Sequence, residues 1–304
     1  MPVIPSSLNT PWPARRRLVR AMVAAPAALL AGCATATPTP AGPADGADPA
    51  QRLQAALASQ PLVLLGEVHD NPEQHRLRAQ ALGRLLADGA RPALLMEQFD
   101  RERQSAIDAA MASAGAQPDA VIDAGWPQGR TGWDWTFYRP FIALALQYRL
   151  PLVAANVSRT DTRRIVAQGL EAAGFDAAVP ADIAQAQADA IVASHCGQVD
   201  ASLARQLMRA QVARDQFMAR QLVAHAAPGA VLLAGNGHVR RDIGVPRWLP
   251  AAWQGRSVAI GLLEAGEAPG AAFDLALFTP AAPRGDPCEG MARIPARPAP
   301  GTAR

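Results

Sequence analysis

Short apolar runs alternate with longer amphipathic segments along most of this chain. Six runs have the length and the apolar character of buried β-strands, and glycine, proline or polar residues bound them. They are residues 62–65, 93–96, 152–155, 230–234, 258–262 and 273–277. Because predicted helices separate most of these runs, the pattern predicts an α/β fold: three layers, with a mostly parallel sheet covered by helices on both faces.

The segments between the runs carry apolar residues at helical spacing among arginine, glutamine and alanine. The predicted helices are residues 72–86, 100–111, 159–173, 181–194 and 201–227, together with a helix that ends at Tyr148. Residues 123–137, before that helix, have no clear period and are predicted to be irregular. No internal repeat is evident.

Polar side chains follow four of the predicted strands. Glu67 and His69 follow the first strand, Glu97 the second, Asn156 the third and His238 the fourth. Each residue alone is explained as well by helix capping or by a hydrogen bond in the core. Because the carboxyl ends of parallel strands share one edge of a sheet, we expect all five side chains to meet in one crevice.

Two glycines flank Asn236 just before His238. Gly235 and Gly237 are expected to form a tight turn with positive φ that directs His238 into the crevice.

The first residues resemble an export signal. Four arginines precede an apolar segment at residues 21–30, which leads to the sequence Leu-Ala-Gly-Cys at residues 30–33. This ending resembles the bacterial lipobox, which predicts a signal peptide over residues 1–32 and a lipidated Cys33. The chain is then expected to be exported and anchored to the outer membrane. An ordinary signal peptide is the alternative, and the arginines allow either Sec or twin-arginine export.

The rest of the chain divides by composition. Residues 33–49 are expected to form a flexible tether, residues 50–280 the folded domain, and residues 281–304 a Pro- and Arg-rich tail. Cys196 and Cys288 are the cysteines that remain after Cys33. In an exported chain this pair predicts a disulfide.

The charge argues against a nucleic-acid partner. The pI of about 9.1 depends on the signal segment, because residues 1–32 carry four arginines and no acid. Without that segment 25 basic side chains face 26 acidic ones, which leaves a net charge of −1. No basic patch indicates a polyanion ligand.

Five longer motifs resemble one family. They are Leu-Leu-Gly-Glu-Val-His-Asp-Asn at 64–71, Leu-Leu-Met-Glu-Gln-Phe at 94–99, Leu-Val-Ala-Ala-Asn-Val-Ser-Arg at 152–159, Gln-Val-Ala-Arg-Asp-Gln-Phe-Met-Ala at 211–219 and Gly-Asn-Gly-His-Val-Arg-Arg-Asp-Ile-Gly-Val-Pro at 235–246. Together they resemble the ChaN-like haem-binding lipoproteins, within a group that includes Tiki-type proteins and erythromycin esterases. The resemblance implies a haem cofactor and a role in haem or iron uptake at the outer membrane. It also implies a homodimer and an outer-membrane haem receptor as partners.

The resemblance raises the question of the iron ligand. Family members are thought to use a tyrosine, so Tyr138, which lies in a segment rich in tryptophan, is expected to bind the haem iron. Arg139, or Arg130, is expected to meet the haem propionates. The alternative is that Tyr138 belongs to the core face of a helix with Trp135 and Phe141. His69, His238 and His195 are the other candidate haem contacts, and His195 also has the simpler explanation of a helix end.

Hydrolysis is the competing function. Glu67, His69, Glu97, Asp215 and His238 suit general-base catalysis, as in the esterase relatives, or the binding of a divalent metal. The chain lacks a Gly-x-Ser-x-Gly elbow and a His-Glu-x-x-His motif. Asp215 lies on an apolar helix face, where it is expected to anchor Arg214 or orient a crevice histidine. An interaction protein without chemistry is a third reading.

Overall fold

A computed structural model describes residues 48–268, 272–286 and 288–289. The predicted signal peptide, Cys33, almost all of the predicted tether and the end of the tail lie outside the described residues. Within the described residues, no helix is both long enough and apolar enough to cross a membrane.

Six parallel strands form one sheet in the order β3-β2-β4-β1-β5-β6. Their bounds are β1 Leu62–Leu65, β2 Ala93–Asp100, β3 Leu152–Asn156, β4 Ala230–Leu233, β5 Ser257–Glu264 and β6 Leu275–Thr279. The predicted strands are thus confirmed, with shifts of a few residues at their ends. Glu97 lies inside β2 rather than after it.

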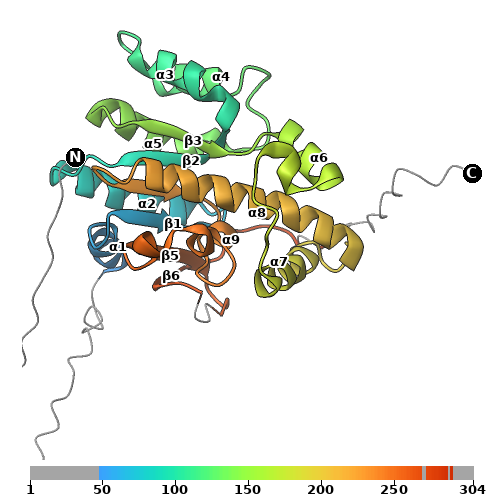
Figure 1. Ribbon diagram of the computed structural model, residues 1–304. Coiled ribbons are helices and arrows are strands. Elements are labelled where there is room, and N and C mark those ends of the chain that lie inside the picture. The colour runs from blue at the N-terminus through green and yellow to red at the C-terminus, as the bar shows by residue number, and fades with distance from the viewer. Residues whose placement is uncertain (1–47, 269–271, 287, 290–304) are drawn as a thin grey trace, which may run out of the picture. The chain divides into compact units, whose positions relative to one another are not determined.

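Helices cover both faces of the sheet (Figure 1). The α-helices are α1 Pro49–Leu57, α2 Pro72–Ala87, α3 Gln104–Ala112, α4 Pro118–Gly125, α5 Trp135–Tyr148, α6 Arg159–Gln168, α7 Ala181–Ser194, α8 Ala201–Ala224, α9 Asn236–Val239 and α10 Ala251–Gln254. Short 3-10 turns lie at Arg101–Arg103, Leu170–Ala173 and Val245–Trp248. The predicted α/β architecture of three layers is confirmed.

The side chains of β1 alternate between the two cores. Val63 and Leu65 pack with apolar residues of α1, α2 and α5, whereas Leu62 and Leu64 pack with residues of α8. All four are buried, which explains why β1 is a continuous apolar run rather than an alternating one. The polar residues after Leu65 therefore follow directly on a strand that is buried on both faces.

The structure corrects the sequence prediction in four segments. Helix α1 was not predicted. Helix α4 continues to Gly125, although residues 123–137 were predicted to be irregular. The helix predicted over 159–173 ends at Gln168, and a 3-10 turn follows Gly169. The long helix α8 ends at Ala224 rather than at 227.

The glycines near His238 serve close approach rather than a left-handed turn. Gly235 has φ −62°, and Gly237 lies within the short helix α9. The predicted positive φ is therefore wrong. A Cβ on Gly235 would lie 2.7 Å from His69 Cε1, and a Cβ on Gly66 would lie 2.3 Å from Asn236 Oδ1. Both glycines are needed because the loops after β1 and β4 touch.

The predicted disulfide is present. Cys196, just after α7, is bonded to Cys288, and their Cα atoms are 5.6 Å apart. Arg284 also holds the start of the tail, because its guanidinium donates to Glu264 and to Asp70. The hydrogen bonds from Arg284 to Glu264 are the main reason that the pKa of Glu264 falls to about 2.

Candidate functional site

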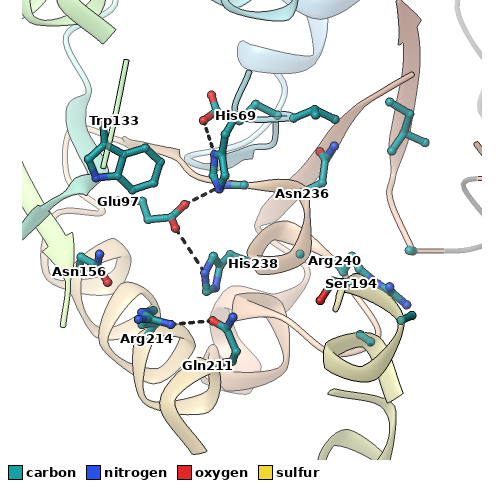
Figure 2. A pocket seen from close by; sticks show the side chains of 18 of the residues that line it. His69, Glu97, Trp133, Asn156, Ser194, Gln211, Arg214, Asn236, His238 and Arg240 are labelled. Carbon is teal, nitrogen blue, oxygen red and sulfur yellow. Dashed lines mark hydrogen bonds and ion pairs between the residues drawn. The ribbon is translucent and has the colours of Figure 1, made fainter. Parts of the chain in front are cut away.

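A cavity of about 1120 Å³ opens where β1, β2, β3 and β4 end (Figure 2). Its lining includes Glu67, His69, Glu97, Asn156 and His238. These residues span more than 170 positions of the chain, and the parallel sheet brings them to one edge. The predicted convergence is therefore confirmed, although the chemical roles of the residues stay predictions.

His69 presents its imidazole to the cavity. Its Nδ1–H donates to Glu67 Oε1 at 2.9 Å, which leaves Nε2 without a hydrogen-bond partner among the described residues. The side chain is 48% exposed and meets the Trp133 ring edge-on, with ring centroids 5.0 Å apart. The carboxylate thus sets which nitrogen of His69 carries the proton and which keeps its lone pair.

Glu67 is buried beneath His69 and forms an ion pair with Arg78 of α2, which is also fully buried. Burial lowers the pKa of Arg78 to about 10, so the guanidinium stays charged at neutral pH. The Tyr138 hydroxyl donates to Glu67 Oε1 at 2.6 Å. Asn71, not Glu67, caps α2, since its side chain accepts a hydrogen bond from the Gln74 backbone N–H.

His75 completes this buried cluster. Its Nε2–H donates to the His69 carbonyl at 3.0 Å, and its ring stacks on Phe137 with centroids 4.7 Å apart. Burial is the main reason that the pKa of His75 falls to about 4. A neutral His75 therefore braces the backbone of His69 without adding charge to the site.

His238 lies between the carboxylates of Glu97 and Asp215. It is on the opposite side of Glu97 from His69 (Figure 2). Its Nδ1–H donates to Asp215 Oδ1 at 2.6 Å, and its Nε2 lies 3.6 Å from Glu97 Oε1. Burial alone would lower the pKa of His238, but Glu97 and Asp215 outweigh it and raise the pKa. The prediction that Asp215 orients a crevice histidine agrees with this contact.

Both acids around His238 have a second partner. Asp215 is fully buried on α8 and accepts from the Gln187 side chain at 2.8 Å. Burial raises the pKa of Asp215. Glu97 accepts from the Gly235 backbone N–H at 2.8 Å. Burial would raise the pKa of Glu97 as well, but the nearby imidazoles reverse the shift, and the pKa is lowered.

The remaining lining adds aromatic surface and positive charge. Part of the aromatic surface comes from the tryptophan-rich segment that the sequence connected with haem, whereas the arginines were not assigned to the site. The aromatic residues are Trp126, Trp133 and Phe273, and the arginines are Arg159, Arg214 and Arg240. Arg159 follows β3 by three residues, so its place just after a strand end is a sequence signal that points to the site. Arg214 precedes Asp215 on α8, but only the fold shows that it reaches the cavity.

Four candidate haem contacts from the sequence lie outside the cavity lining. Tyr138 has no exposed surface, and burial, the largest cause, raises its pKa, which disfavours the phenolate. This corrects its expected environment, because the hydroxyl faces Glu67 rather than the cavity. Arg139 pairs with Asp119 at 3.1 Å, as does Arg130 at 2.9 Å, instead of facing a ligand. His195 ends α7 and donates to the Ile191 carbonyl.

A divalent metal finds no preformed site in the part of the chain that the structure describes. No three histidine, cysteine, aspartate or glutamate side chains there lie close enough together to hold one ion. The reactive groups of the cavity instead form two separate acid–imidazole pairs, Glu67–His69 and Asp215–His238.

Comparison with known proteins adds a family to this geometry. The model of the family described as haem-binding uptake, Tiki superfamily, ChaN matches residues 53–249. The match contains all of the residues placed at the cavity from β1 to β4. No curated protein matches the chain.

A solved structure shares the fold, and others match more weakly. A structure described as cofacial haem binding to ChaN of Campylobacter jejuni has a TM-score of 0.61 at 20% identity, and the match covers 74% of this chain and 90% of that one. The type III effector HopBA1 gives 0.46 at 14% identity, with 77% and 94% covered. A mutant of the erythromycin esterase EreC gives 0.39 at 14% identity, with 73% and 76% covered.

The buried ion pair beneath the cavity makes a test of stability. Arg78→Met leaves the Glu67 carboxylate buried without its charge partner, and we expect a loss of about 3–5 kcal/mol in the free energy of unfolding. The double variant Arg78→Met/Glu67→Gln removes both charges and is expected to recover at least about half of that loss. Urea denaturation measures both values. A double variant no more stable than Arg78→Met would contradict the ion-pair argument.

Proposed function

We propose that this cavity binds haem, from the premise that the chain belongs to the haem-binding uptake family of the Tiki superfamily, ChaN, whose model matches residues 53–249. The ChaN structure from Campylobacter jejuni is described as binding haem cofacially, which supports the same ligand here. The observation that carries the proposal is an open imidazole, His69, beside an aromatic wall in one large cavity.

The lining fits a large flat cofactor. Pockets for small molecules and cofactors have volumes of about 300–1,000 Å³, and this cavity of about 1120 Å³ is slightly larger than that range. Trp126, Trp133 and Phe273 offer apolar surface to a macrocycle. Bound haem would supply an iron centre for redox chemistry, or it would itself be the molecule that the protein transfers.

Among the cavity residues His69 is the best candidate ligand for the iron. Within the described residues its Nε2 has no hydrogen-bond partner, and it keeps its lone pair because Glu67 accepts a hydrogen bond from Nδ1–H and so holds the proton on that nitrogen, an arrangement typical of histidines that bind metals. His238 is a poorer candidate, since its raised pKa favours the protonated ring, which has no lone pair to offer. Tyr138 would first have to leave Glu67 and the core.

The proposed setting is the outer membrane. Leu-Ala-Gly-Cys at residues 30–33 supports lipidation of Cys33 after export, with the folded domain held at the membrane by the tether. In that setting the protein would serve haem or iron uptake, with an outer-membrane haem receptor as the source of haem. A homodimer belongs to the same proposal.

The Asp215–His238 pair favours a second candidate function, hydrolysis of an ester or peptide. In this reaction His69 Nε2 takes a proton from water as the water oxygen bonds to the substrate carbonyl carbon. His238 then gives its proton to the leaving oxygen or nitrogen as the scissile bond breaks. Glu67 and Asp215 orient the two rings, and the raised pKa of His238 suits a proton donor.

Haem binding is tested by titrating the full chain with haemin in detergent. We expect a saturable Soret shift, and we expect His69→Ala to change the band and weaken binding about tenfold or more. His225→Ala is the matched control, because His225 lies at the end of α8 outside the cavity lining. An unshifted Soret band in the wild type would refute haem binding. A spectrum that changes in Tyr138→Phe but not in His69→Ala would identify Tyr138, and not His69, as the iron ligand.

The anchor is tested by fractionating cells that express the full chain. Cys33→Ser removes the lipidated thiol and is expected to move the protein from the membrane fraction to the soluble periplasmic fraction. Ala34→Ser, one residue further along, should leave it in the membrane fraction. If Cys33→Ser stays with the membrane, lipidation is not what anchors the chain.

Hydrolysis is tested with p-nitrophenyl esters and a fluorogenic peptide. Turnover by the wild type should fall by about 10²–10⁴-fold in His238→Ala and in His69→Ala, because each removes one proton-transfer group. His225→Ala again serves as control. Absence of turnover, or turnover that neither variant reduces, would exclude this second function.

A further inference from the structure

Among the residues that the structure describes, two cavity arginines have no acidic partner near enough for an ion pair. Arg240 is neutralised by Asp242, with two hydrogen bonds of 2.9 and 2.5 Å. Within the described residues, neither Arg159 nor Arg214 has a carboxylate within ion-pair distance. Arg214 is half-buried and donates to the Gln211 side-chain oxygen at 3.1 Å, a neutral acceptor.

Arg159 and Arg214 line the same cavity as the His69 imidazole. Arg159 begins α6, and its Nη2 lies 3.4 Å from where a Gly132 Cβ would be, beside the loop that carries Trp133. Arg214 projects from α8, and Figure 2 shows it on the other side of Glu97 and His238 from His69. In this view Trp133 and the His69 imidazole lie toward one end of the cavity, and Arg214 lies toward the other.

Most acids around the cavity already have partners, which leaves the two arginines free for a ligand. Glu67 pairs with Arg78, Glu97 with His238 and the Gly235 backbone, and Asp242 with Arg240. Asp100 is the exception. It lines the cavity close enough to both arginines for their charges to lower its pKa, yet burial outweighs them and raises the pKa.

We propose that Arg159 and Arg214 bind the carboxylates of the cavity ligand, and that they select a flat apolar molecule with two carboxylates. Guanidinium groups bind carboxylates through paired hydrogen bonds, and a half-buried position strengthens such bonds. For haem, on whose binding this inference rests, the groups concerned are the two propionates. Arg159 and Arg214 therefore take the place that the sequence pattern suggested for Arg139.

The experiment compares haemin with haemin dimethyl ester, in which both carboxylates are blocked. Soret titrations use the full chain in detergent, and circular dichroism checks the fold of each variant. The wild type is expected to bind haemin at least about tenfold more tightly than the ester. The double variant Arg159→Gln/Arg214→Gln should lose that preference by weakening haemin alone. Arg139→Gln, outside the cavity, should keep it.

Asp100→Asn provides a test of opposite sign. Removing the acid near both guanidiniums is expected to tighten haemin binding several-fold and to leave the ester unaffected. This variant also covers the case in which the double arginine variant fails to fold.

Failure of this inference differs from failure of haem binding. If haemin and its ester bind the wild type equally, or if the arginine variant keeps its preference for haemin, the carboxylate site is refuted while haem binding stands. If neither ligand binds the wild type, both proposals fall together.

Discussion

The candidate site depends on the buried ion pair between Glu67 and Arg78. Removing two charges from water costs several kcal/mol for each ion, so such a pair persists only where further hydrogen bonds complete it. Here Tyr138 and His69 both donate to Glu67, and Arg78 also donates to the Leu65 carbonyl. Helix α2, helix α5 and the loop after β1 therefore meet on one carboxylate. The Glu67 carboxylate, held in place by these contacts, sets the direction of the His69 imidazole.

The sheet extends this arrangement to the other strands. β1 and β4 are neighbours in register, with Leu65 opposite Leu233, so their loops leave the sheet together. The Asn236 N–H donates to the Glu67 carbonyl, and the Gly235 N–H donates to Glu97 on the adjacent β2. Backbone hydrogen bonds thus link the two acid–imidazole pairs. Gly66 and Gly235 make the link possible because a Cβ at either position would collide with its neighbour.

The sheet and the crevice were predictable because buried parallel strands leave a strong pattern: a continuous apolar run that ends in polar residues. The contacts of Tyr138 and Arg139 were not, since closeness in sequence to a tryptophan cluster does not say which helix face meets the cavity. Trp135, Tyr138 and Phe141 are all buried, as the alternative core-face reading held. Arg139 is one residue further around the helix, about 100° away, and so faces solvent with Asp119. Helix α1 escaped prediction because the chain before it is rich in proline and alanine.

The two candidate functions compete for one lone pair. Iron ligation and general-base catalysis both need the Nε2 of His69, which Glu67 keeps unprotonated by accepting from Nδ1. His238 does not offer a substitute lone pair, because Glu97 and Asp215 favour its protonated ring and the ring is mostly buried. A ligand fixed on His69 would therefore block water activation at the same atom. The two candidate functions would therefore exclude each other in one molecule at any moment.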